Sequence, residues 1–163
     1  MKNQLTTLLP MLRRFAFSLT GSVADADDIV QITIEKILSR GMPEDVELSK
    51  WAFKVCRNVW IDEYRARKVR LAATQNPELQ EEACTDNEEN IAAKETLAQV
   101  NIAMQTLPND QRSILSLVAV QGLSYKEVAE TLDVPVGTVM SRLSRARTSL
   151  LTIVKSQQGG LFA

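Results

Sequence analysis

The chain has 163 residues, of which 45% are hydrophobic, and its formal net charge is −1. This length allows one domain or two small ones, and the hydrophobic content excludes a chain that is disordered throughout. The sequence has no histidine, and its two cysteines, Cys56 and Cys84, lie in different segments. This argues against a disulfide framework, a Cys/His zinc site and histidine-dependent nucleophilic catalysis. We therefore expect no metal, no cofactor and no enzymatic activity.

The distribution of apolar residues predicts an all-α protein. Only six glycines and five prolines are present, and apolar residues recur at spacings of three and four along the chain. Arg13 and Arg14 interrupt the apolar pattern of the first twenty residues, so we expect no signal peptide. No apolar run reaches the roughly 18 residues needed to cross a bilayer. We expect a cytoplasmic protein.

A first small lobe is predicted over residues 1–71 and should contain three helices. The first helix ends near Gly21, and the second begins at a cap from Ser22 or Asp25 and stops before residues 41–43, Gly-Met-Pro. The third is expected as one helix from about residue 48 to 70.

The third helix combines an apolar first half with a basic end. Trp51 and Cys56 are expected in the core, whereas Trp60 could either join the core or stack on an unpaired base. Residues 54–70 contain six basic residues against two acidic ones. Such a helix is suited to contact a polyanion along its final turns.

The middle of the chain is acidic and poor in apolar residues. Residues 71–95 contain seven acidic residues against one basic residue, and residues 72–90 are predicted to form a flexible acidic linker, in which Cys84 is exposed. A second helical lobe is predicted over residues 91–155. Residues 156–163 are predicted to be a frayed tail.

The second lobe is predicted to end in a helix-turn-helix. Ser124 and Glu127 have the spacing of a capping box, and Asp133 occupies the turn, where a positive φ is needed. Pro135 is suited to the start of the second helix. Buried positions along this second helix recur at Val139, Leu143, Ala146 and Leu150, which leaves a face of short and basic side chains free for a DNA groove.

Three segments together carry a resemblance to a known family. They read DADDIVQITIEKIL at 25–38, WAFKVCRNVWIDEYRARKVR at 51–70 and LPNDQRSILSLVAVQGLSYKEVAETLDVPVGTVMSRLSRARTSL at 107–150. In this order they closely resemble the bacterial extracytoplasmic-function (ECF) sigma factors. The resemblance implies an alternative sigma factor that binds RNA polymerase core and directs promoter-specific initiation. It also implies that the first lobe opens the −10 element and that the second lobe reads the −35 element.

One face of the second helix is the predicted polymerase contact. Asp25, Asp28, Gln31 and Glu35 fall on adjacent turns. The resemblance implies that this stripe docks on the β′ subunit of the core, with carboxylates meeting Arg or Lys. The β subunit, promoter DNA and an anti-sigma factor are the other partners that it implies. An ordinary solvated face is the alternative interpretation of this stripe.

The resemblance places −10 recognition on the third helix. Asn58 and Asp62 lie one turn apart, so both could reach one base drawn out of the stack. The basic residues that follow would then hold phosphates. The implied −10 residues are Asn58, Asp62, Arg65, Arg67 and Lys68.

The last helix is the implied −35 reader. Met140, Ser141, Ser144 and Arg145 match the base-contacting positions of the family, and Arg142 and Arg147 match phosphate contacts. Met140 stands where the family often has Lys or Arg, so the promoter sequence does not transfer. The full set of predicted −35 contacts is Thr138, Met140, Ser141, Arg142, Ser144, Arg145 and Arg147.

Two other functions fit parts of the sequence. A stand-alone helix-turn-helix transcriptional regulator would use the same C-terminal motif, but it would have no need of residues 25–70. A metal-dependent nuclease could use clustered carboxylates to hold Mg²⁺. Its ligands would then all come from one regular helix.

Overall fold

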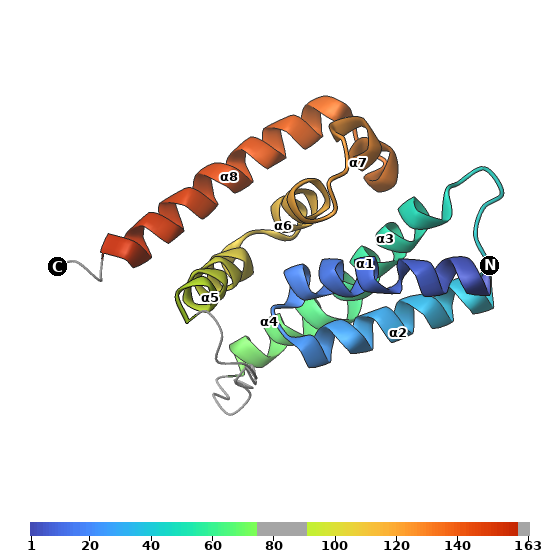
Figure 1. The fold of residues 1–163 in the computed structure, drawn as a ribbon, viewed down its shortest axis with the longest axis horizontal. Coiled ribbons are helices and arrows are strands. Elements are labelled where there is room, and N and C mark those ends of the chain that lie inside the picture. Colours follow the sequence, from blue (N-terminus) through green and yellow to red (C-terminus); the bar gives the residue numbers. More distant parts are fainter. Residues whose placement is uncertain (75–90, 160–163) are drawn as a thin grey trace. The chain divides into compact units, whose positions relative to one another are not determined.

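The structure is a computed structural model that describes residues 1–74 and 91–159 (Figure 1). The chain divides into two compact units. The described residues 1–74 belong to the first unit and residues 91–159 to the second. Most of the predicted linker, including Cys84, lies outside the described residues.

The first unit is built from three helices that pack against one another: α1 (Lys2–Thr20), α2 (Val23–Arg40) and α3 (Leu48–Val59) (Figure 1). The rings of Phe15 and Phe53 meet edge to face, with their centroids 5.3 Å apart. Aromatic pairs prefer this geometry because the positive ring edge faces the negative ring surface. The largest fully buried side chains of the unit are Leu12, Phe15, Leu19, Ile29, Ile37, Phe53 and Val59.

Local chemistry sets the ends of these helices. Gly21 follows α1 with φ 71°, a left-handed conformation that glycine adopts without a Cβ clash. The Ser22 side chain caps α2 by accepting a hydrogen bond from the backbone N–H of Asp25 at 3.3 Å. Of the two caps that the sequence allowed, Ser22 is therefore the one used.

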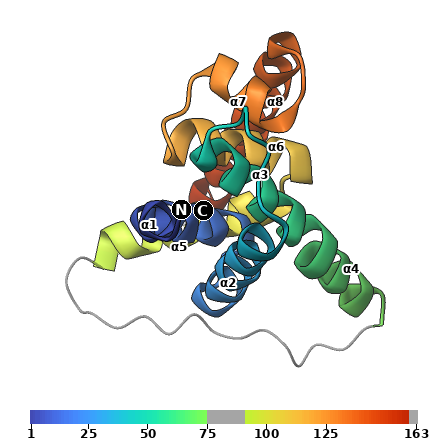
Figure 2. The same cartoon turned by 90° about the vertical axis from the view of Figure 1, so that its right-hand side faces the viewer.

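The third predicted helix is continuous but not uniform. α3 passes into a π-helical segment, η1 (Trp60–Arg65), and then into α4 (Ala66–Ala73), as one helical rod (Figure 2). Trp60 is only 2% exposed, so it belongs to the core. Trp51 is half-buried, and the expectation that it lies in the core is wrong. Residues 72 and 73 belong to α4, so the prediction that the linker begins at residue 72 is wrong.

The second unit contains α5 (Ile91–Thr106), α6 (Asn109–Leu115), η3 (Ser116–Val120), α7 (Tyr125–Leu132) and α8 (Val136–Gly159). α8 packs against α5, α6 and α7. α8 extends to Gly159, so the prediction that residues 156–163 form a frayed tail is wrong for residues 156–159. The largest fully buried side chains of this unit are Leu107, Ile114, Leu117, Val128 and Leu143.

Both ends of α7 have the predicted chemistry. The Ser124 hydroxyl accepts from the Glu127 backbone N–H at 3.1 Å, and the Glu127 carboxylate accepts from the Ser124 backbone N–H at 2.8 Å. Asp133 ends α7 with φ 55°, and it is the only non-glycine residue with positive φ in the described ranges. The predicted capping box and left-handed aspartate are both confirmed.

A buried arginine joins α5 to α6. Arg112 is 3% exposed, and its guanidinium donates to the Gln105 side-chain oxygen at 3.0 Å and to the Leu107 carbonyl at 3.1 Å. It also donates to the Gln105 carbonyl. Carbonyls at a helix C-terminus have no partner within the helix, so this guanidinium satisfies the end of α5.

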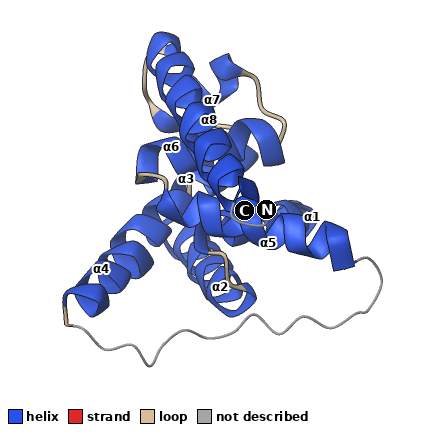
Figure 3. Ribbon diagram, turned by 90° about the vertical axis from the view of Figure 1, so that its left-hand side faces the viewer, coloured by secondary structure: helices blue, strands red, loops and turns tan. Residues whose placement is uncertain are grey.

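Helix is the only regular structure over the described residues, which confirms the all-α prediction (Figure 3). None of these helices combines the length and the apolar character required to traverse a lipid bilayer.

Candidate functional site

The first candidate surface is the acidic face of α2, formed by Asp25, Asp28, Gln31 and Glu35. Asp28, Gln31 and Glu35 are exposed, and Asp25 is half-buried. The amide of Gln31 donates to the Glu35 carboxylate at 3.5 Å, so adjacent turns of the face are in contact. Carboxylates exposed in this way are suited to meet a partner that carries Arg or Lys.

The carboxylates of the acidic face influence the pKa of a tyrosine in η1, Tyr64, which the sequence pattern does not single out. Tyr64 is half-buried in η1. Burial, followed by the charge of Asp28, its hydrogen bond and the charge of Asp25, raises the pKa of Tyr64 to about 12, against an opposing effect of Arg67. The Arg67 guanidinium lies over the Tyr64 ring, 5.7 Å from its centroid.

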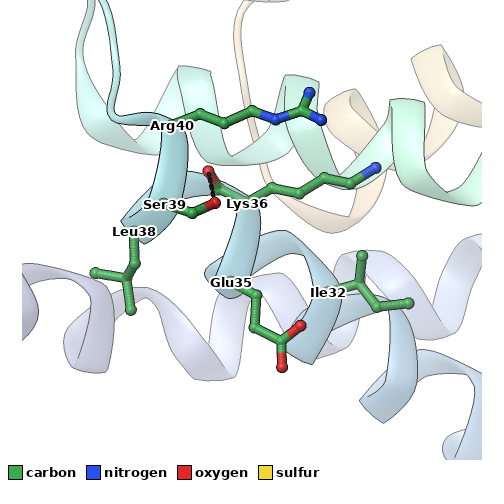
Figure 4. A pocket seen from close by; sticks show the side chains of 6 residues that line it. All are labelled: Ile32, Glu35, Lys36, Leu38, Ser39 and Arg40. Carbon is green, nitrogen blue, oxygen red and sulfur yellow. Dashed lines mark hydrogen bonds between the residues drawn. The ribbon is translucent and has the colours of Figure 1, made fainter.

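A second contact joins α2 to η1 near the other end of the acidic face. Lys36 Nζ lies 3.5 Å from Glu63 Oε1. Figure 4 shows Lys36 and Arg40 extending to the same side of α2, whereas Glu35 points away from them. These side chains border a shallow depression lined by Ile32, Glu35, Lys36, Leu38, Ser39 and Arg40.

The second candidate surface is the face of α3 and η1 that carries Asn58 and Asp62. Both side chains are exposed, and the buried Trp60 lies between them in sequence. Trp60 therefore supports this face from within the core. Its burial removes it from the residues that could stack on a base.

The basic residues that follow differ in exposure. Arg65 is half-buried, and its guanidinium lies over the Trp60 ring, 5.8 Å from the centroid. Burial lowers the pKa of Arg65. Arg67 and Lys68 are exposed. Of the three predicted phosphate contacts, Arg65 is therefore partly engaged within the protein.

Cys56 lies beneath this surface and is fully buried, as predicted. Burial raises the pKa of its thiol to about 12, and a hydrogen bond with Thr33 opposes this shift. The thiolate is the reactive form of cysteine, so this environment suppresses reactivity. In the described part of the chain, no three His, Cys, Asp or Glu side chains are grouped so that they could hold a metal ion.

The third candidate surface is the outer face of α8. Val139, Leu143 and Ala146 are buried against the rest of the unit, as the spacing predicted, whereas the fourth predicted position, Leu150, is only half-buried. Met140 is 53% exposed, and Thr138 is half-buried. The remaining exposed members of the predicted −35 set are Ser141, Ser144, Arg145 and Arg147.

Arg142 occupies the edge of this surface and has an acidic neighbour. Its Nη1 lies 3.5 Å from Asp110 Oδ2 of α6. The helical pattern identifies Arg142 but not Asp110, which is distant in sequence.

Two segments of the chain match known protein families. Residues 5–70 match the family described as Sigma-70 region 2, and residues 99–150 match Sigma-70, region 4. The ECF RNA polymerase sigma factor EcfG of Rhodopseudomonas palustris is 30% identical over 156 residues, which cover 94% of this chain and 84% of that protein. The chain belongs to the ECF RNA polymerase sigma factors.

Other ECF sigma factors show the same likeness. SigC of Mycobacterium tuberculosis is 32% identical over 132 residues, covering 79% of this chain and 70% of that protein. The solved structure of the sigma factor RpoE from Bartonella quintana, in complex with the anti-sigma factor NepR, matches with a TM-score of 0.76 and 29% identity. That match covers 94% of this chain and 96% of RpoE. The protein is therefore an alternative sigma factor that directs transcription initiation.

Proposed function

We propose that the three surfaces divide the work of initiation between the two units. Residues 1–71 would bind the polymerase core and open the −10 element, and residues 91–155 would read the −35 element. The observation that carries this proposal is the exposure of opposite charges on different faces, acidic along α2 and basic on α4 and α8.

The acidic face of α2 would dock on the polymerase core. Asp28 and Glu35 are exposed carboxylates, and Gln31 adds hydrogen-bonding capacity between them. Charge-assisted hydrogen bonds between carboxylates and Arg or Lys give both orientation and strength. The β′ subunit would be the main contact, and the apolar Ile32 and Leu38 beside Glu35 would add to it.

Asn58 and Asp62 would capture a base of the opened −10 element. A base that has left the stack is recognised by hydrogen bonds to its exposed edge. An amide and a carboxylate provide the donor and acceptors that such recognition needs. Arg67 and Lys68 would hold the adjacent phosphates, with Arg65 contributing the part of its guanidinium that remains exposed.

The outer face of α8 would enter the major groove at the −35 element. Arg145 can reach a guanine edge with two hydrogen bonds, and Met140 can contact a thymine methyl group. Ser141, Ser144 and Thr138 would complete the base contacts. Arg142 and Arg147 would bind phosphates on either side.

An anti-sigma factor is the proposed regulator, because the related RpoE was solved in complex with one. The protein would act in the cytoplasm, where it supplies specificity and no catalysis of its own. The test is run-off transcription with purified bacterial core polymerase on a pool of genomic promoters. Specific transcripts that require the added chain are expected. Duplex promoter binding without the polymerase and without stimulated transcription would instead identify a stand-alone regulator.

A further inference from the structure

Two arginines that are proposed to hold −10 phosphates lie over aromatic rings of η1. The Arg67 guanidinium is 5.7 Å from the centroid of the Tyr64 ring. The Arg65 guanidinium is 5.8 Å from the centroid of the Trp60 ring. A cation within about 6 Å of a ring is attracted by the negative charge of the ring face. Each of these two rings therefore holds one arginine.

The π-helical turn of η1 accounts for the pair formed by Trp60 and Arg65. Residues five apart point about 140° away from each other around an α-helix of 3.6 residues per turn. In a π-helix the backbone hydrogen bonds join residues five apart, so such residues lie on the same side. Trp60 and Arg65 are the first and last residues of η1. The wider turn thus brings the guanidinium over a ring that the core holds fixed.

The pair formed by Tyr64 and Arg67 joins a half-buried ring to an exposed cation. Tyr64 belongs to η1, and Arg67 lies in the first turn of α4. Residues three apart are neighbours on a helix surface. Glu63, four residues before Arg67, has a spacing at which carboxylates commonly pair with arginine. Lys36 of α2 lies 3.5 Å from that carboxylate, so Glu63 is engaged towards α2.

A ring contact and an ion pair have different consequences for phosphate binding. Arg13 of α1 donates to both carboxylate oxygens of Asp27, at 2.8 and 3.2 Å. A guanidinium binds phosphate through this same two-bond geometry, so the Arg13 fork is already occupied. Attraction to a ring face needs no hydrogen-bond acceptor. The Tyr64 contact therefore restricts Arg67 without requiring the N–H groups that a phosphate would accept from.

We propose that Tyr64 is a positioning residue for the −10 element: its ring holds the Arg67 guanidinium in place before a phosphate of the opened strand arrives. The inference rests on the proposed role of Arg67 as a phosphate contact. Ordering one long side chain on binding costs about two- to tenfold in affinity. A ring that has already ordered the side chain removes this loss.

The test is a double-mutant cycle on binding of the holoenzyme to fork DNA whose −10 element is single-stranded. The holoenzyme is assembled from the full chain and bacterial core polymerase, and the fork carries a promoter identified by run-off transcription. Tyr64→Leu removes the ring but keeps an apolar side chain, and it should weaken binding about two- to tenfold. Tyr64→Phe keeps the ring and should bind as the wild type does. In the Arg67→Ala background, Tyr64→Leu should cause no further loss.

Arg70→Ala provides the matched background, because Arg70 is another exposed arginine of α4. Tyr64→Leu should cause its full loss there. Thermal unfolding of every variant by circular dichroism fixes an assay temperature at which all of them are folded. The affinity of each variant for core polymerase alone sets the chain concentration that saturates the holoenzyme.

Three results overturn the positioning role while Arg67→Ala itself still weakens binding. They are no loss from Tyr64→Leu, the same loss from Tyr64→Leu in the wild-type and Arg67→Ala backgrounds, and the same loss from Tyr64→Phe as from Tyr64→Leu. Disappearance of the Tyr64→Leu effect in the Arg70→Ala background also contradicts a specific link to Arg67. If Arg67→Ala binds the fork as the wild type does, the proposed phosphate contact is wrong and the inference fails with it.

Discussion

Arg142 of α8 and Asp110 of α6 form an ion pair across the second unit, with Nη1 and Oδ2 3.5 Å apart. Both side chains are about a third to a half exposed, at 34% and 48%. An ion pair this exposed contributes little to stability, typically about 0–1 kcal/mol. Its effect should therefore be on DNA binding, because it places a negative charge beside a proposed phosphate contact.

Asp110→Ala should strengthen binding to duplex DNA of any sequence, since it removes a competing anion from Arg142. Arg142→Ala should weaken binding similarly across sequences and reduce the slope of log affinity against log salt by about 1. Fluorescence anisotropy at several salt concentrations measures both effects. An unchanged salt slope in Arg142→Ala would remove Arg142 from the phosphate contacts.

Arg145→Ala should act on sequence preference instead of general affinity. Loss of a two-hydrogen-bond contact to a base costs about 1–3 kcal/mol at one position of the −35 element and relaxes the preference there. Arg147→Ala, on the same helix, should weaken all promoters alike. Binding selections on a −35 library distinguish the two, and an intact preference in Arg145→Ala would contradict its role as a base reader.

Asn58→Ala should leave duplex promoter binding by the holoenzyme largely intact and slow promoter opening. The reason is that its proposed partner is a base already drawn from the stack. Permanganate footprinting reports the opened strand directly. A promoter with a pre-opened −10 bubble should not restore capture fully, and opening at the wild-type rate would show that Asn58 has no such role.

Cys56 should be unreactive in the folded protein at mildly alkaline pH. Burial raises its thiol pKa from 9.0 to about 12, so the thiolate fraction is small and access is closed. In a Cys84→Ser variant, alkylation followed by mass spectrometry measures Cys56 alone. Modification is expected only after denaturation, and rapid modification of the native protein would contradict the buried environment.

The raised pKa of Tyr64 predicts that the free energy of unfolding falls in strong alkali. Its pKa rises from 10.0 to about 12 on folding, so the folded state holds the proton more tightly than the unfolded state. The contribution of protonated Tyr64 to the free energy of unfolding is complete below pH 10 and disappears as the pH rises towards 12. Urea unfolding should show that Tyr64→Phe loses less stability than the wild type across this interval. Parallel losses in the two proteins would contradict the shifted pKa.

The features that the sequence predicted well are those set by neighbours in the chain. Ser124, Glu127 and Asp133 act through contacts within a few residues, and the structure has each as expected. The periodicity of α8 likewise identified Val139, Leu143 and Ala146 as buried, although Leu150 is only half-buried. Local spacing could not reveal the π-helical segment, because residues 48–70 have helical character throughout.

The contacts that the sequence did not reveal join elements that are distant in the chain. Lys36 meets Glu63, and Arg142 meets Asp110, only because helices pack in a particular register. Arg112 is buried against the carbonyls at the end of α5, a contact that no local spacing indicates. The prediction that Trp51 lies in the core was wrong, because apolar character alone does not determine which aromatic residue a small core encloses.

The length of α8 has a mechanical consequence. Its 24 residues form a rod of about 36 Å. Residues 138–158 contain neither glycine nor proline, the residues at which helices most often kink. Since α5, α6 and α7 all pack against this one straight helix, three helices of the unit together set the direction in which the Arg145 face of α8 points.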